Sequence, residues 1–304
     1  MEKLSFIDKA LERAKSLRQN KEKSTPPLNW ESPASDLPPL RTTRFIGPAA
    51  GSTDVDYTLT RTVSVDMEFL HKNRLIFGQE DSALSEGYKM LRTHILQRTK
   101  GQQGNVLMIT GPLPGEGKTL TAINLAISIS QEVNKTALLI DADLRSPRIH
   151  RYFGLKVNLG LADHLKTGVP LTEILIHPNG LGKLVLLPAG RATAQASELI
   201  NSSLMHDLVQ ELKHFYPDRF VLFDFPPLLS YADALAFAPL VDGIILVVEA
   251  GKTPRGDIDR CLKMLKEFPV LGLVLNKVDA PPQSNYYYQN GVPDTPKRKF
   301  LWFK

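Results

Sequence analysis

Short apolar runs recur through the centre of the chain, and segments with helical spacing separate them. Apolar runs this short that alternate with helices are typical of strands in a parallel sheet buried on both faces. The predicted strands are residues 106–109, 137–140, 184–187, 220–223, 244–248 and 271–275. The first helix carries one apolar face, formed by Leu84, Tyr88, Leu91 and Ile95, and the next helix is predicted over 117–133. Residues 82–280 are therefore predicted to form one α/β domain, with a doubly wound, mostly parallel sheet and helices on both faces.

The segments on either side of this region follow other patterns. Residues 1–20 place apolar side chains at steps of three and four, which predicts a short amphipathic helix. So short a helix needs a surface to dock on, which is either its own domain or a partner or membrane. Residues 21–81 are predicted to be a proline-rich linker or arm, with a weak strand at 55–66. Residues 281–304 are predicted to form a polar tail.

Composition narrows the class of protein. The 304 residues are 42% hydrophobic and 23% charged, as is usual for a globular protein. The single cysteine, Cys261, excludes an intramolecular disulfide and fits a reducing compartment. No apolar run approaches the roughly 18–20 residues that span a bilayer, and no signal peptide is recognisable. A cytoplasmic location is expected.

The net charge of +5 suggests a nucleic-acid partner at first sight. Residues 281–304 hold four Lys or Arg and one Asp, which is +3, so the preceding residues carry only +2. No nucleic-acid partner is therefore expected. The tail combines basic and aromatic residues, which suits either an anionic membrane interface or a plain solubilising end.

A glycine-rich loop follows the first predicted strand. Residues 111–119 are Gly-Pro-Leu-Pro-Gly-Glu-Gly-Lys-Thr and lead into a predicted helix, the context of a phosphate-binding P-loop. The amides of such a loop bind phosphate, its lysine reaches the β- and γ-phosphates, and its Ser or Thr hydroxyl holds Mg²⁺. Strict spacing places the first glycine at Pro112, whereas this chain has Gly111 one position earlier. The nucleotide-binding residues that this loop predicts are Gly115, Glu116, Gly117, Lys118, Thr119 and Leu120.

Three aspartates stand at the ends of later strands. Asp141 and Asp143 follow the second predicted strand, and Asp224 follows the fourth. Ligands of open α/β sheets bind at the carboxyl ends of the strands, so these carboxylates should share an edge with Lys118. Mg²⁺ takes one or two carboxylates, with water and phosphate completing its coordination. Three carboxylates at one edge favour a Mg-nucleotide site over three unrelated helix or turn caps.

The last predicted strand ends in Asn-Lys-Val-Asp at residues 276–279, which matches the guanine-reading motif of GTPases. A second interpretation is that Asn276 lines a purine pocket and that Asp279 begins a turn before Pro281. Four residues do not separate these interpretations on their own.

Several segments together resemble the bacterial tyrosine kinases (BY-kinases) of exopolysaccharide and capsule synthesis. The resemblance covers about residues 82–280 and is most specific where an apolar run leads into Asp-x-Asp-x-Arg. The start of the chain, at 6–12, resembles the soluble, exosortase-linked subgroup. The segments that carry the resemblance are residues 86–95, 111–119, 138–147 and 220–227.

The resemblance implies a P-loop NTPase fold, ATP with Mg²⁺, and a role for each site residue. Members often end their last strand in Asn-Lys, so Asn276 is expected on the adenine side and ATP is preferred to GTP. The reaction would transfer the γ-phosphoryl group to a tyrosine, with Asp141 as the base. Arg145 would either hold phosphate or form a salt bridge. The implied catalytic residues are Lys118, Asp141, Asp143 and Asp224, and the residues on the metal side are Thr119, Asp143 and Asp224.

The family also phosphorylates a tyrosine-rich tail in trans, which implies a homo-oligomer. The expected acceptors are Tyr286, Tyr287 and Tyr288, and the other interpretation is a polar tail without this role. Ring assembly in the family uses Glu-x-x-Arg-x-x-Arg on a helix, and the matching residues here are Glu86, Lys89 and Arg92. Lysine cannot make the bidentate contact of arginine, so this departure bears on ring formation.

A separate transmembrane chain-length (co-polymerase) protein is the activator that the resemblance implies, with this chain peripheral at the inner face of the membrane. Two other functions stay open. One is a partitioning-type (ParA/MinD-like) ATPase switch, although that class has a signature lysine where this chain has Leu113 or Pro114. The other is a nucleotide-sensing assembly protein of a polysaccharide machine without significant kinase activity.

Overall fold

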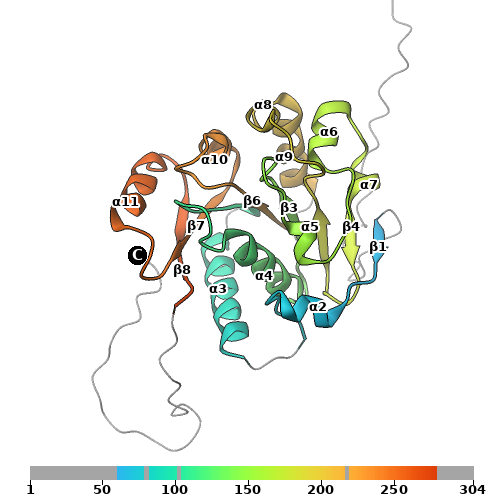
Figure 1. Cartoon of the computed structure of the whole chain (residues 1–304), viewed down its shortest axis with the longest axis horizontal. Helices are drawn as coiled ribbons and strands as arrows, with labels where there is room; N and C mark the ends of the chain where they lie inside the picture. Colours follow the sequence, from blue (N-terminus) through green and yellow to red (C-terminus); the bar gives the residue numbers. More distant parts are fainter. Residues whose placement is uncertain (1–59, 79–81, 101–103, 216–218, 279–304) are drawn as a thin grey trace, which may run out of the picture. The chain divides into compact units, whose positions relative to one another are not determined.

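The computed structural model describes residues 60–78, 82–100, 104–215 and 219–278. Their strands form one eight-stranded sheet in the order β1-β4-β5-β3-β6-β2-β7-β8 (Figure 1). All neighbouring strands pair in parallel except β4 and β5, which are antiparallel. The strands are β1 (Arg61–Val63), β2 (Val106–Thr110), β3 (Thr136–Asp141), β4 (Ile176–Pro178), β5 (Leu184–Leu187), β6 (Arg219–Asp224), β7 (Gly243–Glu249) and β8 (Val270–Asn276).

Helices cover both faces of this sheet. All residues of β2 are buried, and since successive strand residues point to opposite faces, neither face of β2 meets solvent. The helix α4 packs on β2, β3, β5 and β6, α3 packs on α4, and α9 packs on β2. The helices are α2 (Met67–Lys72), α3 (Ala83–Thr99), α4 (Lys118–Ser130), α5 (Ile149–Tyr152), α6 (Leu161–Thr167), α7 (Leu171–Ile174), α8 (Ala196–Ile200), α9 (Ser203–Phe215), α10 (Asp233–Phe237), the 3-10 turn η1 (Ala238–Leu240) and α11 (Arg255–Met264).

The predicted fold class is confirmed. Each of the six predicted strands is present, and its observed bounds differ from the predicted ones by at most one residue at either end. The two predicted helices correspond to α3 and α4. Ser82 caps α3, because its hydroxyl accepts a hydrogen bond from the Ser85 N–H (3.1 Å).

The folded region begins before Ser82, where the sequence analysis placed the domain start. Strand β1 and helix α2 lie upstream, and Leu70, Leu75 and Ile76 are buried in the same core cluster as α4. The Asn124 side chain on α4 accepts a hydrogen bond from the Ile76 N–H (3.0 Å) and donates one to the carbonyl of residue 74 (3.0 Å). Residues 60–78 therefore belong to the domain, since their apolar side chains complete its core.

Strand β4 was not predicted. It is three residues long, and it pairs with β1, which lies inside the predicted weak strand at 55–66. The predicted N-terminal helix, the linker up to residue 59 and the tail with Tyr286, Tyr287 and Tyr288 lie outside the described residues. Among the residues that are described, no helix has the length and apolar character needed to cross a membrane.

Candidate functional site

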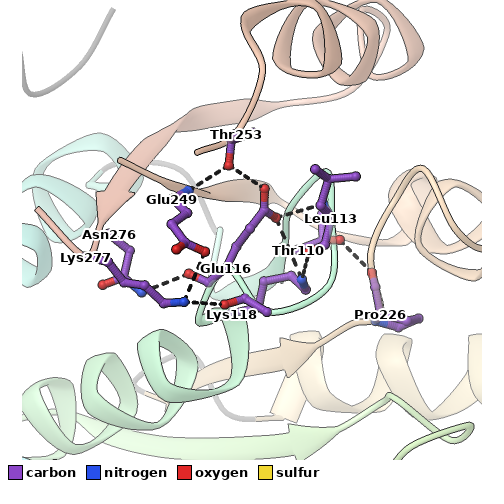
Figure 2. A network of polar contacts seen from close by, with 10 residues as sticks. Thr110, Leu113, Glu116, Lys118, Pro226, Glu249, Thr253, Asn276 and Lys277 are labelled. Atoms are coloured by element: carbon purple, nitrogen blue, oxygen red, sulfur yellow. Dashed lines mark hydrogen bonds and ion pairs between the residues drawn. The ribbon is translucent and has the colours of Figure 1, made fainter. Parts of the chain in front are cut away.

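The predicted phosphate loop joins β2, which ends at Thr110, to α4, which begins at Lys118 (Figure 2). The Thr110 hydroxyl donates to the carbonyl of Pro226 (2.8 Å), which ties this strand end to the segment after β6. Gly117 precedes the helix with φ of +92°, a left-handed conformation that favours glycine. A Cβ at Gly117 would lie 2.1 Å from the Asn276 side-chain nitrogen. The loop therefore packs closely against the end of β8.

Gly111 accounts for the departure from strict P-loop spacing. A Cβ at this position would lie 2.2 Å from the carbonyl oxygen of Val247 on β7 and 2.7 Å from the Glu116 carboxylate. The loop thus leaves β2 in a space that admits only glycine at 111. The shift from Pro112 to Gly111 reflects how the loop packs on β7, and the strand–loop–helix arrangement is retained.

Glu116 gives the loop a buried negative charge, because its side chain is only 2% exposed. One carboxylate oxygen, Oε2, accepts a hydrogen bond from the Leu113 N–H (2.8 Å). The other, Oε1, accepts one from the Thr253 hydroxyl (2.7 Å). The Lys118 ammonium lies 3.8 Å from Oε2, so a buried pair of opposite charges sits inside the loop (Figure 2).

Lys118 is buried at the start of α4, and its ammonium donates to the carbonyl of Leu113. Burial lowers the pKa of Lys118, while the charges of Glu116, Asp224 and Asp143 oppose that shift. Because Asp143 and Asp224 act on the same ammonium and Asp141 is the register partner of Asp224, the predicted lysine and the predicted aspartates meet at one edge of the sheet. This edge is the carboxyl end of β2, β3 and β6, as the sequence pattern predicts.

Asp141 and Asp224 form a buried acidic pair on neighbouring strands. They are register partners at the ends of β3 and β6. Asp141 Oδ2 accepts hydrogen bonds from the N–H groups of Arg148 and Ile149, both at 3.0 Å. Burial raises the pKa of Asp141 to about 7, and burial together with the charge of Asp141 raises the pKa of Asp224 well above its usual range. Within the described residues, Oδ1 of each aspartate has no hydrogen-bond partner.

The oxygen atoms at this edge fit Mg²⁺. The Thr119 hydroxyl is hydrogen-bonded to Asp224, and a carboxylate oxygen of Asp224 stays without a partner among the described residues. Hydroxyl and carboxylate oxygens are ligands that Mg²⁺ prefers, and phosphate and water complete its shell. The described residues hold no cluster of three or more His, Cys, Asp or Glu that could bind a metal on its own. The oxygens of Thr119 and Asp224 suit a Mg²⁺ ion whose remaining ligands are phosphate and water oxygens.

Asp143 lies nearer the surface than the buried pair. It is partly exposed, and its carboxylate accepts a hydrogen bond from the Ser146 N–H (3.0 Å). Burial raises the pKa of Asp143, and the charges of Arg148 and Lys118 partly offset that shift. Arg148 is exposed and acts on both Lys118 and Asp143, so a cation that the sequence analysis did not single out faces this edge.

Arg145 forms the salt bridge rather than an open phosphate contact. Its guanidinium lies 2.9 Å from the carboxylate of Asp233, which is buried at the start of α10. The same guanidinium donates to the Ser197 hydroxyl (2.8 Å) and lies over the Tyr231 ring, 4.7 Å from its centroid. Of the two roles that the sequence left open for Arg145, the structure shows the one that holds its loop.

Asn276 and Lys277 bind the backbone of the phosphate loop. The Asn276 side chain donates to the carbonyl of Glu116 (2.9 Å), and the Lys277 ammonium donates to the carbonyl of Gly115 (2.7 Å). Asn276 is therefore next to the predicted nucleotide site, and its contact with adenine stays a prediction. Asp279, the last residue of the GTPase-like motif, lies outside the described residues. Sequence reasoning missed Lys277 and Thr253, although the Asn-Lys sequence was a signal for the former.

The three residues predicted for ring assembly lie on α3 in different surroundings. Lys89 and Glu86 form an ion pair (2.7 Å) on the exposed part of the helix. Arg92 turns toward α4, where its guanidinium donates to the carbonyl of Ser128 (2.9 Å) and pairs with Glu132 (2.7 Å). The Arg92 side chain is 17% exposed, so this arginine contributes to packing within the chain.

Fold and site together define a P-loop nucleotide-binding domain: a glycine loop between a strand and a helix, a buried lysine, and acids at the ends of adjacent strands. The model of the family described as "CobQ/CobB/MinD/ParA nucleotide binding domain" matches residues 107–291. Tyrosine-protein kinase YwqD of Bacillus subtilis (strain 168) is 33% identical over 221 residues, which are 72% of this chain and 92% of YwqD. The chain belongs to this nucleotide-binding family and, within it, to the bacterial tyrosine kinases.

Two further relatives set the context. The solved kinase domain of the Escherichia coli tyrosine kinase ETK is 26% identical, with a TM-score of 0.62, over 75% of this chain and 93% of that domain. The succinoglycan biosynthesis transport protein ExoP of Rhizobium meliloti (strain 1021) is 32% identical over 72% of this chain. The match covers only 28% of ExoP, so ExoP holds a similar domain within a much longer chain. The exosortase-linked subgroup stays a prediction.

Proposed function

We propose that this chain is an ATP-dependent protein-tyrosine autokinase that regulates the synthesis and export of an exopolysaccharide or capsule. One observation carries the proposal: Asp143 and Asp224 act on the Lys118 ammonium, and Asp141 is the register partner of Asp224, in a chain 33% identical to a tyrosine-protein kinase. The ExoP name, which refers to succinoglycan biosynthesis, supports the polysaccharide context.

The phosphate loop binds the nucleotide in this scheme. Amide groups of Gly115, Glu116, Gly117, Thr119 and Leu120 surround the phosphates at the start of α4, where the helix N-terminus adds positive potential. Lys118 exchanges its contact with the Leu113 carbonyl for phosphate oxygens. Mg²⁺, when bound by Thr119, Asp143 and Asp224, supplies charge neutralisation for the phosphates. Asn276 borders the adenine, which favours ATP over GTP.

Asp141 is the proposed base. A phenol has a pKa near 10, so a nearby carboxylate assists by accepting its proton as the oxygen attacks. The phenolic oxygen bonds to the γ-phosphorus, the bond from that phosphorus to the β–γ bridging oxygen breaks, and ADP leaves. A pKa of about 7 keeps Asp141 partly ionised at neutral pH, and its Oδ1 has no competing partner among the described residues. Most of the rate enhancement comes from positioning and charge.

The proposed acceptors are Tyr286, Tyr287 and Tyr288, phosphorylated by a second copy of the chain. The structure describes the chain up to residue 278, directly after β8, so the tail follows the strand end that contacts the phosphate loop. Sequence places these tyrosines 8 to 10 residues beyond that point. Glu86 and Lys89 remain available for contact between copies, whereas Arg92 is engaged with α4.

The proposed activator is a transmembrane polysaccharide co-polymerase, which would hold this chain at the inner face of the cell membrane. ExoP, in which a domain like this one forms only 28% of a transport protein, supports such a partnership. No nucleic-acid partner is proposed.

Incubation of the purified full-length chain with Mg-ATP tests the proposal, with phosphotyrosine and released phosphate measured in parallel. The wild-type chain is expected to gain phosphotyrosine. In Lys118→Ala the rate of phosphotyrosine formation should fall at least about 100-fold, because the phosphates lose the buried cation that binds them. Arg98→Ala on α3 serves as a control, because its guanidinium donates to the carbonyl of Leu271 near the start of β8, the end opposite Asn276. Phosphate release without phosphotyrosine, even with the membrane partner present, would favour an ATPase switch and sink the kinase proposal.

A further inference from the structure

Three residues outside the P-loop motif brace the phosphate loop from one side (Figure 2). Glu249 is the last residue of β7, Thr253 lies before α11, and Lys277 follows β8. The Glu249 N–H donates to the Thr253 hydroxyl (2.8 Å), and the Lys277 ammonium donates to the Glu249 carboxylate (3.0 Å). Glu249, Thr253 and Lys277 are named the Glu249 clamp below.

The Thr253 hydroxyl has only one orientation in this arrangement. It accepts a hydrogen bond from the Glu249 N–H, which can only donate, so its own proton points to Glu116 Oε1 at 2.7 Å. A hydrogen bond to an ionised carboxylate is about twice as strong as one between neutral groups. Thr253 therefore holds one oxygen of Glu116, while the Leu113 N–H holds the other (2.8 Å).

Lys277 acts on the loop backbone. It has φ of +56°, uncommon for a residue other than glycine, and in this conformation its ammonium reaches the carbonyl of Gly115 (2.7 Å). In a trans peptide the C=O and the next N–H point in opposite directions. Holding the Gly115 carbonyl outward thus directs the Glu116 N–H to the other side. Asn276 holds the next carbonyl, that of Glu116, in the same way, and this directs the Gly117 N–H to the opposite side.

We propose that the Glu249 clamp positions the phosphate loop for nucleotide binding, with Thr253 and Lys277 as its two positioning residues. By binding Oε1, Thr253 fixes the Glu116 carboxylate with Oε2 at 3.8 Å from the Lys118 ammonium, beyond hydrogen-bond distance, so the lysine stays available to phosphate. Lys277 keeps the loop amides aimed at the ligand. The inference rests on the proposed function only in placing a nucleotide at this loop, and it holds for a kinase or an ATPase alike.

Loss of the Thr253 hydroxyl has a specific consequence. Without the hydrogen bond at Oε1, the Glu116 carboxylate is free to rotate, and its Oε2, now 3.8 Å from the Lys118 ammonium, can move into direct contact with it. Glu116 then competes with the nucleotide phosphates for this lysine. Nucleotide affinity falls, while the acids at the ends of β3 and β6 are unchanged. If the substitution lowers nucleotide affinity more than it lowers the maximal rate of phosphoryl transfer, Thr253 acts by positioning the loop and not as a catalytic residue.

The test compares Thr253→Val with Thr253→Ser in the full-length chain, using a fluorescent ADP with Mg²⁺ as the probe. Valine keeps the shape and removes the hydroxyl, so affinity should fall about tenfold, whereas serine keeps the hydroxyl and should bind within about twofold of wild type. Thr167→Val is the matched control, because it removes a threonine hydroxyl that donates to the Asp163 carbonyl on α6. This hydrogen bond is exposed, so T167V should lower the melting temperature less than T253V does, and it should leave ADP affinity unchanged.

A second variant keeps the proposal decidable if T253V does not fold. Lys277→Met retains the aliphatic stem and removes the donor to Gly115, and its ADP affinity should also fall several-fold with the maximal rate retained. Wild-type affinity in T253V or K277M overturns the proposal, as does equal loss in T253S and T253V. Since the readout is nucleotide binding, absence of phosphotyrosine would contradict the proposed function and leave this inference standing.

Discussion

Asp141 and Asp224 carry the main electrostatic cost of the site at the scale of single residues. Both are buried at adjacent strand ends, and burial disfavours the ionised form of each. The charge of Asp141 further raises the pKa of Asp224. The proposed Mg²⁺ would relieve this cost by bringing positive charge to the pair, so that binding of the cation with its nucleotide would stabilise the folded chain.

The first prediction concerns how stability depends on pH. The folded pKa of Asp141, about 7, lies above its ordinary 3.8, so the native state holds a proton that the unfolded state has lost between these values. The free energy of unfolding should therefore fall as pH rises from about 4 to about 7. Asp141→Asn removes this titration, so the free energy of unfolding of the variant should fall by about 1–3 kcal/mol less than that of the wild type over the same pH range. Urea unfolding in EDTA at pH 5 and pH 8 measures it, and parallel pH profiles for variant and wild type would contradict it.

The sequence predicted the motif residues and missed their neighbours, for a physical reason. Lys118, Thr119 and the aspartates follow directly from the loop motif and from strand ends, which are local patterns. Thr253 meets Glu116 across 137 positions, and Lys277 meets Gly115 across 162. Such contacts depend on how β7 and β8 pack beside β2, which no short pattern encodes. The need for glycine at position 111 could not be predicted either, because it arises from the carbonyl oxygen of Val247 on the distant strand β7.

At the scale of elements, the next prediction concerns how helix α3 packs on helix α4. The phosphate loop leads straight into α4, so whatever fixes α4 also fixes the lysine at its first residue. Arg92 joins the two helices through the Ser128 carbonyl and Glu132, whereas Glu86 and Lys89 lie on the exposed side. The stripe that the family resemblance assigns to ring assembly is thus divided between packing and surface.

Arg92→Ala should destabilise the chain by about 1–2 kcal/mol, because a charge-assisted hydrogen bond and a partly buried ion pair are lost. Glu86→Gln should change the free energy of unfolding by less than about 0.5 kcal/mol, since its pair with Lys89 is exposed. Urea denaturation of both variants measures this difference. Equal stability of R92A and wild type would mean that the guanidinium is not needed for packing and is free for contact between copies.

Strands and helices could be predicted from the sequence where their pattern of apolar residues was long enough to be recognised. Strands β2, β3, β5, β6, β7 and β8 are short apolar runs in a sheet buried on both faces, and their bounds were recovered closely. Strands β1 and β4 have three residues each, too few for a period to be recognised. The helix α2 was assigned to the linker, although Asp66 caps it by accepting from the N–H groups of Glu68 and Phe69.

Charge and tail act together at the scale of the whole molecule. The chain carries +5 in total and +3 of it in residues 281–304, beside the three tyrosines. Phosphorylation adds about −1.5 to −2 per tyrosine, which exceeds that local charge when all three are modified. The proposed autophosphorylation would therefore reverse the sign of the tail's charge and change its affinity for an anionic membrane or an acidic partner.

The most direct measurement of the central claim mixes two full-length variants with Mg-ATP. One carries Lys118→Ala and keeps its tyrosines, and the other has an intact site but Tyr286, Tyr287 and Tyr288 replaced by Phe. Mass spectrometry should find phosphotyrosine in the tail of the K118A chain only when both are present, because one copy phosphorylates the other. If neither chain gains phosphotyrosine although the wild type binds nucleotide, or if K118A alone labels its own tail, the proposed trans-autokinase is contradicted.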